Sequence, residues 1–111
     1  MKTISYDQLK KIKDAGEDFL LINVLPAQKF NEAHIPDSIN IPLEEADFEA
    51  QVEEAADGKT KKIVTYCASV DCHASGNAAD KLEKAGFTNV LAYEGGIKEW
   101  QEKSGKRQAA A

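Results

Sequence analysis

Two cysteines in the middle of this 111-residue chain are the residues best suited to carry out chemistry. Cys67 follows an apolar run over 62–66, and Cys72 lies in the irregular segment that comes next. A cysteine thiolate is a strong nucleophile toward disulfides, persulfides and related sulfur compounds. The types and spacing indicate a nucleophile or sulfur carrier at Cys67 and a second thiol at Cys72. For each cysteine a purely structural role stays open, because free cysteine also packs as a small apolar residue.

The reactivity of Cys67 depends on the elements on either side of it. The run KIVTY over 62–66 is typical of a buried parallel strand, and a helix is predicted to begin at Ala74 or Ser75 and to end at Ala85. Parallel sheets bind ligands at the carboxyl ends of their strands. Free N–H groups at a helix start also lower the pKa of a nearby thiol. We therefore predict a substrate-binding loop between strand and helix, whose residues besides the cysteines are Ala68, Ser69, Val70, Asp71 and His73.

Helical and strand-like patterns alternate along the rest of the chain, which indicates an α/β fold. Further strands are predicted over 19–24, 38–41 and 89–92, and further helices over 6–15, 27–33, 43–56 and 97–103. The helix over 43–56 has an acidic outer side, which is typical of a solvated face and, less often, of a recognition surface. The sequence predicts one domain over 1–104 and a disordered tail over 105–111.

Composition excludes several classes of function. With 14 basic and 19 acidic residues the formal charge is −5, so no positive field attracts nucleic acid. No apolar stretch approaches the length that spans a membrane. Two cysteines do not make a disulfide scaffold, and we expect a cytoplasmic protein with reduced thiols.

The order of these features resembles the rhodanese-like domain family. The similarity includes HIPDSINIP over 34–42, the strand-ending Cys67, Ser75 at the next helix start, and Gly95 and Gly96 before Trp100. The resemblance implies a three-layer fold, in which helices flank a parallel five-stranded sheet. It also implies a sulfurtransferase, in which a small-molecule or protein donor passes sulfane sulfur to Cys67. The resulting persulfide then reacts with a thiol or another nucleophilic acceptor, without a dissociable cofactor or a metal.

The loop departs from the family pattern in two ways. It is two residues longer, and Ala74 stands where the family has an arginine beside the serine. No Arg or Lys occurs between Cys67 and Asp80, and Asp71 adds a negative charge. Because arginine binds oxyanions with two hydrogen bonds, we expect thiosulfate to be a poor donor. His73 occupies the position where a phosphatase of this fold needs arginine, so phosphatase activity is not expected.

Two other functions compete with sulfur transfer. A dithiol–disulfide redox protein would use Cys67 and Cys72 and retain no extra sulfur. A non-catalytic interaction domain would use the acidic helix and leave Cys67 unreactive. Within a sulfurtransferase, Cys72 can attack a persulfide on Cys67 or accept its sulfur, if the loop brings the thiols together.

Overall fold

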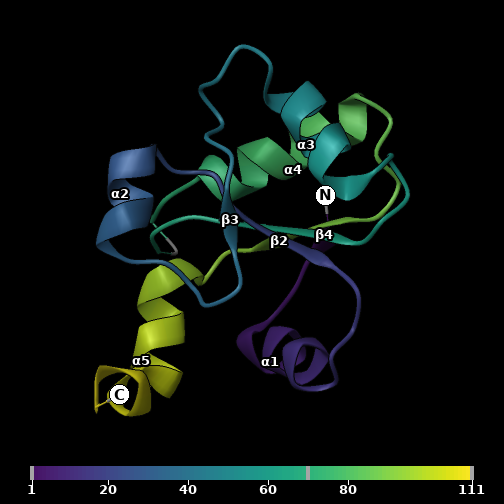
Figure 1. Cartoon of the computed structure of the whole chain (residues 1–111). Coiled ribbons are helices and arrows are strands. Elements are labelled where there is room, and N and C mark those ends of the chain that lie inside the picture. The colour runs from purple at the N-terminus through teal and green to yellow at the C-terminus, as the bar shows by residue number, and fades with distance from the viewer. Residues whose placement is uncertain (1, 70, 111) are drawn as a thin grey trace.

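A parallel sheet forms the middle layer of the computed structural model, which describes residues 2–69 and 71–110, with only the backbone of 105–110 (Figure 1). Its strands lie in the order β1-β5-β4-β2-β3, and each pairs in parallel with its neighbours. In the register, Tyr66 lies between Asn23 and Tyr93, so the carboxyl ends of β2, β4 and β5 meet at one edge. The strands are β1 (Lys2–Thr3), β2 (Leu20–Asn23), β3 (Ile39–Asn40), β4 (Ile63–Tyr66) and β5 (Val90–Tyr93).

Helices cover both faces of this sheet, with α3 and α4 on one face and α1 and α5 on the other (Figure 1). The core beneath α3 and α4 includes Phe48, Val52 and Leu82, whereas Leu9 and Trp100 belong to the core on the opposite face. This arrangement confirms the predicted three-layer α/β fold. The helices are α1 (Tyr6–Asp14), α2 (Ala27–Glu32), α3 (Phe48–Ala56), α4 (Ala74–Lys84) and α5 (Gly96–Ala110).

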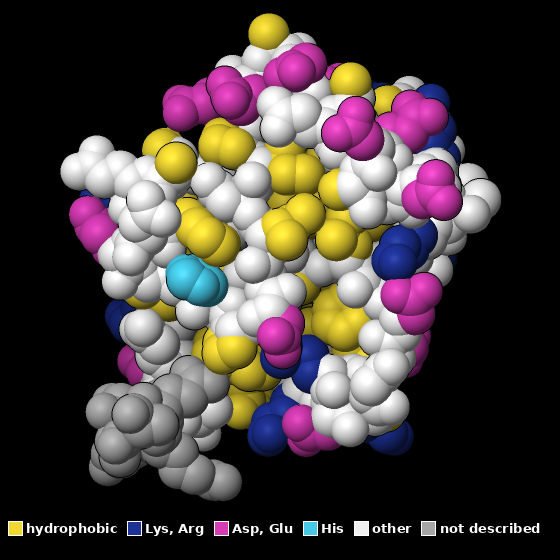
Figure 2. All heavy atoms as spheres, in the orientation of Figure 1, with side chains coloured by type: hydrophobic (Ala, Val, Ile, Leu, Met, Phe, Trp, Pro, Cys, Tyr) yellow, Lys and Arg dark blue, Asp and Glu magenta, His cyan; other side chains and the backbone are white. Residues whose placement is uncertain are grey.

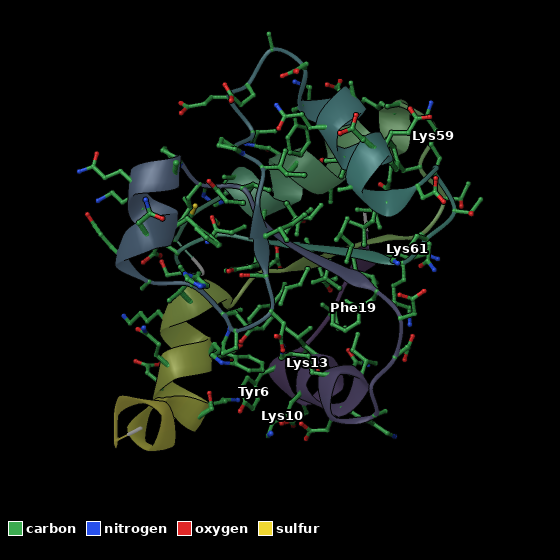
Figure 3. The ribbon with its side chains drawn as sticks, in the orientation of Figure 1. Tyr6, Lys10, Lys13, Phe19, Lys59 and Lys61 are labelled. Carbon is green, nitrogen blue, oxygen red and sulfur yellow. The ribbon has the colours of Figure 1, made fainter. Side chains whose placement is uncertain are left out.

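The helix α1 has a clear start signal and an apolar side. Ser5 and Gln8 form a capping box, in which each side chain accepts a hydrogen bond from the other's backbone N–H. Tyr6 and Lys13 both lie under the sheet (Figure 3), where the ring of Tyr6 is 5.2 Å from that of Trp100. Lys13 Nζ lies 5.7 Å from the centre of the Trp100 ring, so α1 and α5 pack against each other through aromatic and cationic groups.

Three elements differ from the sequence-based prediction. The edge strand β1 was not predicted, because it consists of only two residues and both are polar. Its pairing with β5 is continued by the hydrogen bond from the Ile4 N–H to the Ala92 carbonyl (3.0 Å). The helix predicted over 43–56 begins at Phe48, because turns bonded to the carbonyls of Pro42 and Glu45 precede it. The last helix is α5 (Gly96–Ala110), whereas the sequence predicted its end at 103; the disordered tail over 105–111 stays a prediction. Alanine, lysine, arginine and glutamine all favour helix in that segment. The domain boundary after 104 stays a prediction, and residue 111 lies outside the described residues.

Acidic side chains gather over α3 and the segment before it, along the top of the face shown in Figure 2. Glu53 and Glu54 are exposed, whereas Phe48, Val52 and Ala56 point into the core. This burial pattern confirms an amphipathic helix with a solvated acidic side.

The helices of the described residues include none that is both long and apolar enough to cross a membrane.

Candidate active site

Cys67 lies directly after β4, at the edge of the sheet where the sequence predicted it. Its side chain is 0% exposed, and its thiol donates a hydrogen bond to the Cys72 carbonyl at 3.3 Å. Cys72 is half-buried and packs against the core cluster that contains Cys67. Both residues are free thiols. The structure therefore brings the two cysteines together, with the Cys67 thiol buried and bonded to the Cys72 backbone.

The first residues of this loop are fixed by the start of α5. The backbone N–H groups of Ile97 and Lys98 donate to the carbonyls of Cys67 (3.0 Å) and Ala68 (2.9 Å). Gly96 makes this close approach possible, since a Cβ there would lie 2.5 Å from the Cys67 carbonyl oxygen. Gly96 also has a φ of +66°, which glycine adopts readily. The sequence analysis identified this glycine only as part of a family pattern and missed its contact with the loop.

The far end of the loop is fixed by the start of α4. The Thr65 hydroxyl, buried in β4, donates to the Ser75 carbonyl at 2.9 Å. Between these two fixed ends, the Cys72 N–H donates to the Ser69 carbonyl at 3.0 Å and closes a turn. The backbone of the loop is therefore fixed by these hydrogen bonds, none of which uses a charged side chain.

Burial raises the pKa of the Cys67 thiol, and the hydrogen bond with the Cys72 side chain raises it further. The backbone N–H and the hydroxyl of Ser75 act in the opposite direction, because both favour the thiolate. Ser75 is 1% exposed, and its hydroxyl makes no hydrogen bond within the described residues. A buried donor is thus already aimed at the sulfur atom that would become negative.

Cys72 is the more acidic thiol of the pair. Partial burial raises its pKa, but hydrogen bonds from the Cys67 thiol and from the N–H groups of Ala74 and Ala68 outweigh that effect. The pKa of Cys72 therefore lies below that of an ordinary cysteine, while the pKa of Cys67 lies above it. Of the two thiols, Cys72 therefore loses its proton at the lower pH.

The order of alkylation tests this difference between the two pKa values. With limiting iodoacetamide at neutral pH, Cys72 is expected to react before Cys67, because only the thiolate reacts and Cys67 is fully buried. As the pH is lowered, the alkylation rate of Cys72 should persist to a lower pH than that of a model thiol, because the pKa of Cys72 is lowered. In Cys67→Ala, which lacks the thiol donor, the rate should fall at neutral pH. Peptide mapping by mass spectrometry measures both; earlier modification of Cys67 would contradict this assignment.

The residues of the predicted substrate-binding loop differ in their exposure. Ala68, Asp71 and His73 are exposed and Ser69 is half-buried, whereas Val70 lies outside the described residues. The backbone N–H groups that lower the pKa of the two thiols belong to Ala68, Ala74 and Ser75, and the last two lie in the first turn of α4. The sequence analysis predicted a cradle over 68–73 and missed Ala74 and Ser75, although their place at a helix start was a usable signal.

The histidines occupy structural or exposed positions. A ring nitrogen of His34 lies 2.9 Å from the Phe30 carbonyl, and the His34 ring stacks on Phe30 with centroids 4.1 Å apart. His73 precedes α4 without a capping hydrogen bond from its side chain. In the part of the chain that the structure describes, no three His, Cys, Asp or Glu side chains gather as a metal site.

The turn that carries the HIP sequence is bound to the residue before Cys67. The Ile35 N–H donates to the Tyr66 hydroxyl at 3.0 Å, and that hydroxyl lies 2.6 Å from the Ser38 Oγ. Ser38 in turn donates to the Ile35 carbonyl at 2.6 Å. The end of β4 is thus anchored on the side of β2 and β3 as well as on the side of α5.

A cleft of about 650 Å³ begins at Ser69 and runs between the start of α1 and the start of α5. Its lining includes neither cysteine. Four acidic and two basic residues contribute to it, namely Asp7, Glu94, Glu99, Glu102, Lys98 and Lys103. The cleft beside the loop therefore has more acidic than basic side chains.

Comparison with known proteins gives consistent matches over nearly the whole chain. The family model of the rhodanese-like domain matches residues 5–103. The rhodanese domain-containing protein CG4456 of Drosophila melanogaster is 31% identical, with 91% of this chain and 97% of that protein covered. The adenylyltransferase and sulfurtransferase MOCS3-1 of Zea mays is 34% identical over 87% of this chain, which spans only 21% of the maize protein. The human single-domain sulfurtransferase TSTD1 has a similar structure, with a TM-score of 0.77, 21% identity, and coverage of 93% of this chain and 97% of that one.

Proposed function

The chain belongs to the rhodanese-like domain family, and on that basis we propose that it carries sulfane sulfur on Cys67. In the loading step, the Cys67 thiolate attacks the outer sulfur of a donor persulfide, R–S–SH. The product is Cys67–S–SH, and the donor leaves as the thiolate R–S⁻. In the second step, a thiol or another nucleophile takes the outer sulfur and restores Cys67. Sulfurtransferase activity is named for the relatives from maize and human, which supports this reaction class.

The observation that carries this proposal is the contact between Cys67 and the start of α4. The N–H and the hydroxyl of Ser75 both favour negative charge on the Cys67 sulfur, and the Ser75 hydroxyl is a buried donor that makes no hydrogen bond within the described residues. A thiolate or a persulfide on Cys67 would supply the missing acceptor. Because Cys67 is fully buried, a donor can reach its sulfur only after a local movement of the residues around it.

The surroundings of the loop favour a persulfide or a protein donor over thiosulfate. The described loop residues include no cation that could pair with a dianion, and Asp71 is exposed within the loop. The adjacent cleft adds the carboxylates of Glu94, Glu99 and Glu102. Backbone N–H groups of the loop can bind the thiosulfate anion, so a weaker reaction with this donor is expected. We propose the cytoplasm as the place of this reaction, because two neighbouring thiols stay reduced there.

Sulfur loading can be measured directly by mass. Reduced Cys72→Ser, incubated with glutathione persulfide and desalted, is expected to gain the mass of one sulfur atom. Peptide mapping should place that atom on Cys67, and the double variant Cys67→Ser, Cys72→Ser should gain none. Loss of the added mass on treatment with dithiothreitol would identify it as sulfane sulfur. If Cys72→Ser stayed unmodified while circular dichroism showed it folded, sulfur transfer would be the wrong function.

A further inference from the structure

We propose that Cys72 attacks the persulfide formed on Cys67, so that the chain releases sulfide and closes a disulfide between the two cysteines. This inference rests on the proposed function, because it begins from the loaded Cys67. It assigns the first acceptor of the sulfur carrier to a residue of the same loop. It also makes a dithiol reductant a necessary co-reactant of each cycle.

The geometry of the loop brings Cys72 next to the Cys67 thiol. The Cys67 thiol already donates to the Cys72 carbonyl at 3.3 Å, and Cys72 packs against the cluster that contains Cys67. Backbone hydrogen bonds from α5 fix one end of the loop, and the Thr65 hydroxyl fixes the other end at Ser75. A nucleophile held beside its target reacts as if its concentration were far above that of a thiol in solution.

The charge distribution in the pair supports the same roles. Hydrogen bonds from the N–H groups of Ala74 and Ala68 lower the pKa of Cys72 and so favour its thiolate, which is the form that attacks. Burial of Cys67 disfavours negative charge and so favours the protonated persulfide, Cys67–S–SH. A protonated outer sulfur can leave as HS⁻, whereas an ionised one would have to leave as the much poorer S²⁻. The buried Cys67 is therefore suited to carry the persulfide, and the half-buried Cys72 is suited to attack it.

The reaction balances as Cys67–S–SH + Cys72–S⁻ → Cys67–S–S–Cys72 + HS⁻. The bond between the Cys67 sulfur and the outer sulfur breaks, and the outer sulfur leaves with the electron pair and its proton. A new bond joins the two cysteine sulfurs, so the pair is oxidised by two electrons and the sulfane sulfur is reduced to sulfide. An external dithiol then reduces the disulfide to the two free thiols.

Intact mass and released sulfide together test the proposal. Wild type, Cys72→Ser and Cys72→Ala are loaded with glutathione persulfide, rapidly desalted and kept without a reductant. Wild type is expected to lose the mass of two hydrogen atoms relative to the reduced protein and to release one sulfide for each disulfide formed. Both Cys72 variants should keep the extra sulfur and release sulfide at least about tenfold more slowly, since an intramolecular nucleophile is missing.

Each other outcome has a distinct meaning. If wild type kept the extra sulfur as long as the two variants, Cys72 would not be the acceptor and the inference would be overturned, while sulfur carriage on Cys67 would stand. Disulfide formation without released sulfide would also overturn it, in favour of a dithiol redox protein. Failure of the Cys72 variants to gain sulfur would remove the proposed function and this inference together.

Discussion

Replacement of Gly96 by alanine is expected to lower the free energy of unfolding by more than about 3 kcal/mol and to abolish sulfur loading of Cys67. The left-handed backbone at Gly96 alone costs an alanine about 1–3 kcal/mol. The new Cβ would also lie 2.5 Å from the Cys67 carbonyl oxygen and 2.8 Å from the Ser69 nitrogen. These are backbone atoms, so the loop has to move away from α5 and lose its hydrogen bonds to Ile97 and Lys98. Urea unfolding and intact mass after persulfide loading measure the two effects.

Gly16 provides a matched control for this prediction. It has a φ of +68°, close to the +66° of Gly96, but an added Cβ would meet no atom within 4 Å. Gly16→Ala should therefore show the cost of backbone strain without any displacement of the loop, and its sulfur loading should equal that of wild type. Equal stability and equal loading in the two variants would contradict the role assigned to the contact of Gly96 with the loop.

Replacement of Ala74 by arginine is expected to raise kcat/KM for thiosulfate by about tenfold to hundredfold. Hydrogen bonds between charged groups contribute about 1.5–3 kcal/mol, and every 1.4 kcal/mol is a factor of ten. Ala74 begins α4 and its N–H contacts the Cys72 sulfur, so a guanidinium at this position would lie beside the two thiols. A cyanide-dependent thiocyanate assay with thiosulfate as the donor measures the change.

The comparison variant for this experiment is Ala74→Gln, which adds a long polar side chain without charge. It should leave thiosulfate use near that of wild type, and neither variant should gain with a neutral trisulfide donor. A similar gain in both variants would show that side-chain size at 74, and not the missing positive charge, limits the use of thiosulfate.

Most of the fold was predictable because its central strands are short apolar runs. The sequence predicted β2, β4 and β5 from residues that are buried on both faces of the sheet, such as Ile22, Val64 and Ala92. The strand β1 gave no such signal, since Lys2 and Thr3 are exposed and pair with β5 through the backbone alone. The start of α3 was placed too early, because an acidic composition does not separate a turn from a first helical turn.

The candidate site was predictable in its position and not in its packing. A strand-ending cysteine before a helix identified Cys67, and the same loop identified Cys72. The position of the Cys67 backbone depends on α5, whose N–H groups hold the loop across a distance of about thirty residues in the chain. Side-chain hydrogen bonds in such a loop follow from tertiary contacts, so the opposite pKa shifts of the two thiols had no signature in the sequence.

The position of β1 beside β5 has a consequence for synthesis on the ribosome. The partner of Lys2 and Thr3 lies at Leu91 and Ala92, so the first strand cannot enter the sheet until nearly the whole described chain has been translated. At about 5–20 residues per second, this delay is roughly 5–20 s. Cys67 and Cys72 emerge before β5 and α5, the elements that complete their surroundings. The 25 residues from Cys72 to Ile97 take about 1–5 s at the same rate, and during this shorter interval both thiols of the nascent chain are open to cellular oxidants that the finished loop would keep away from Cys67.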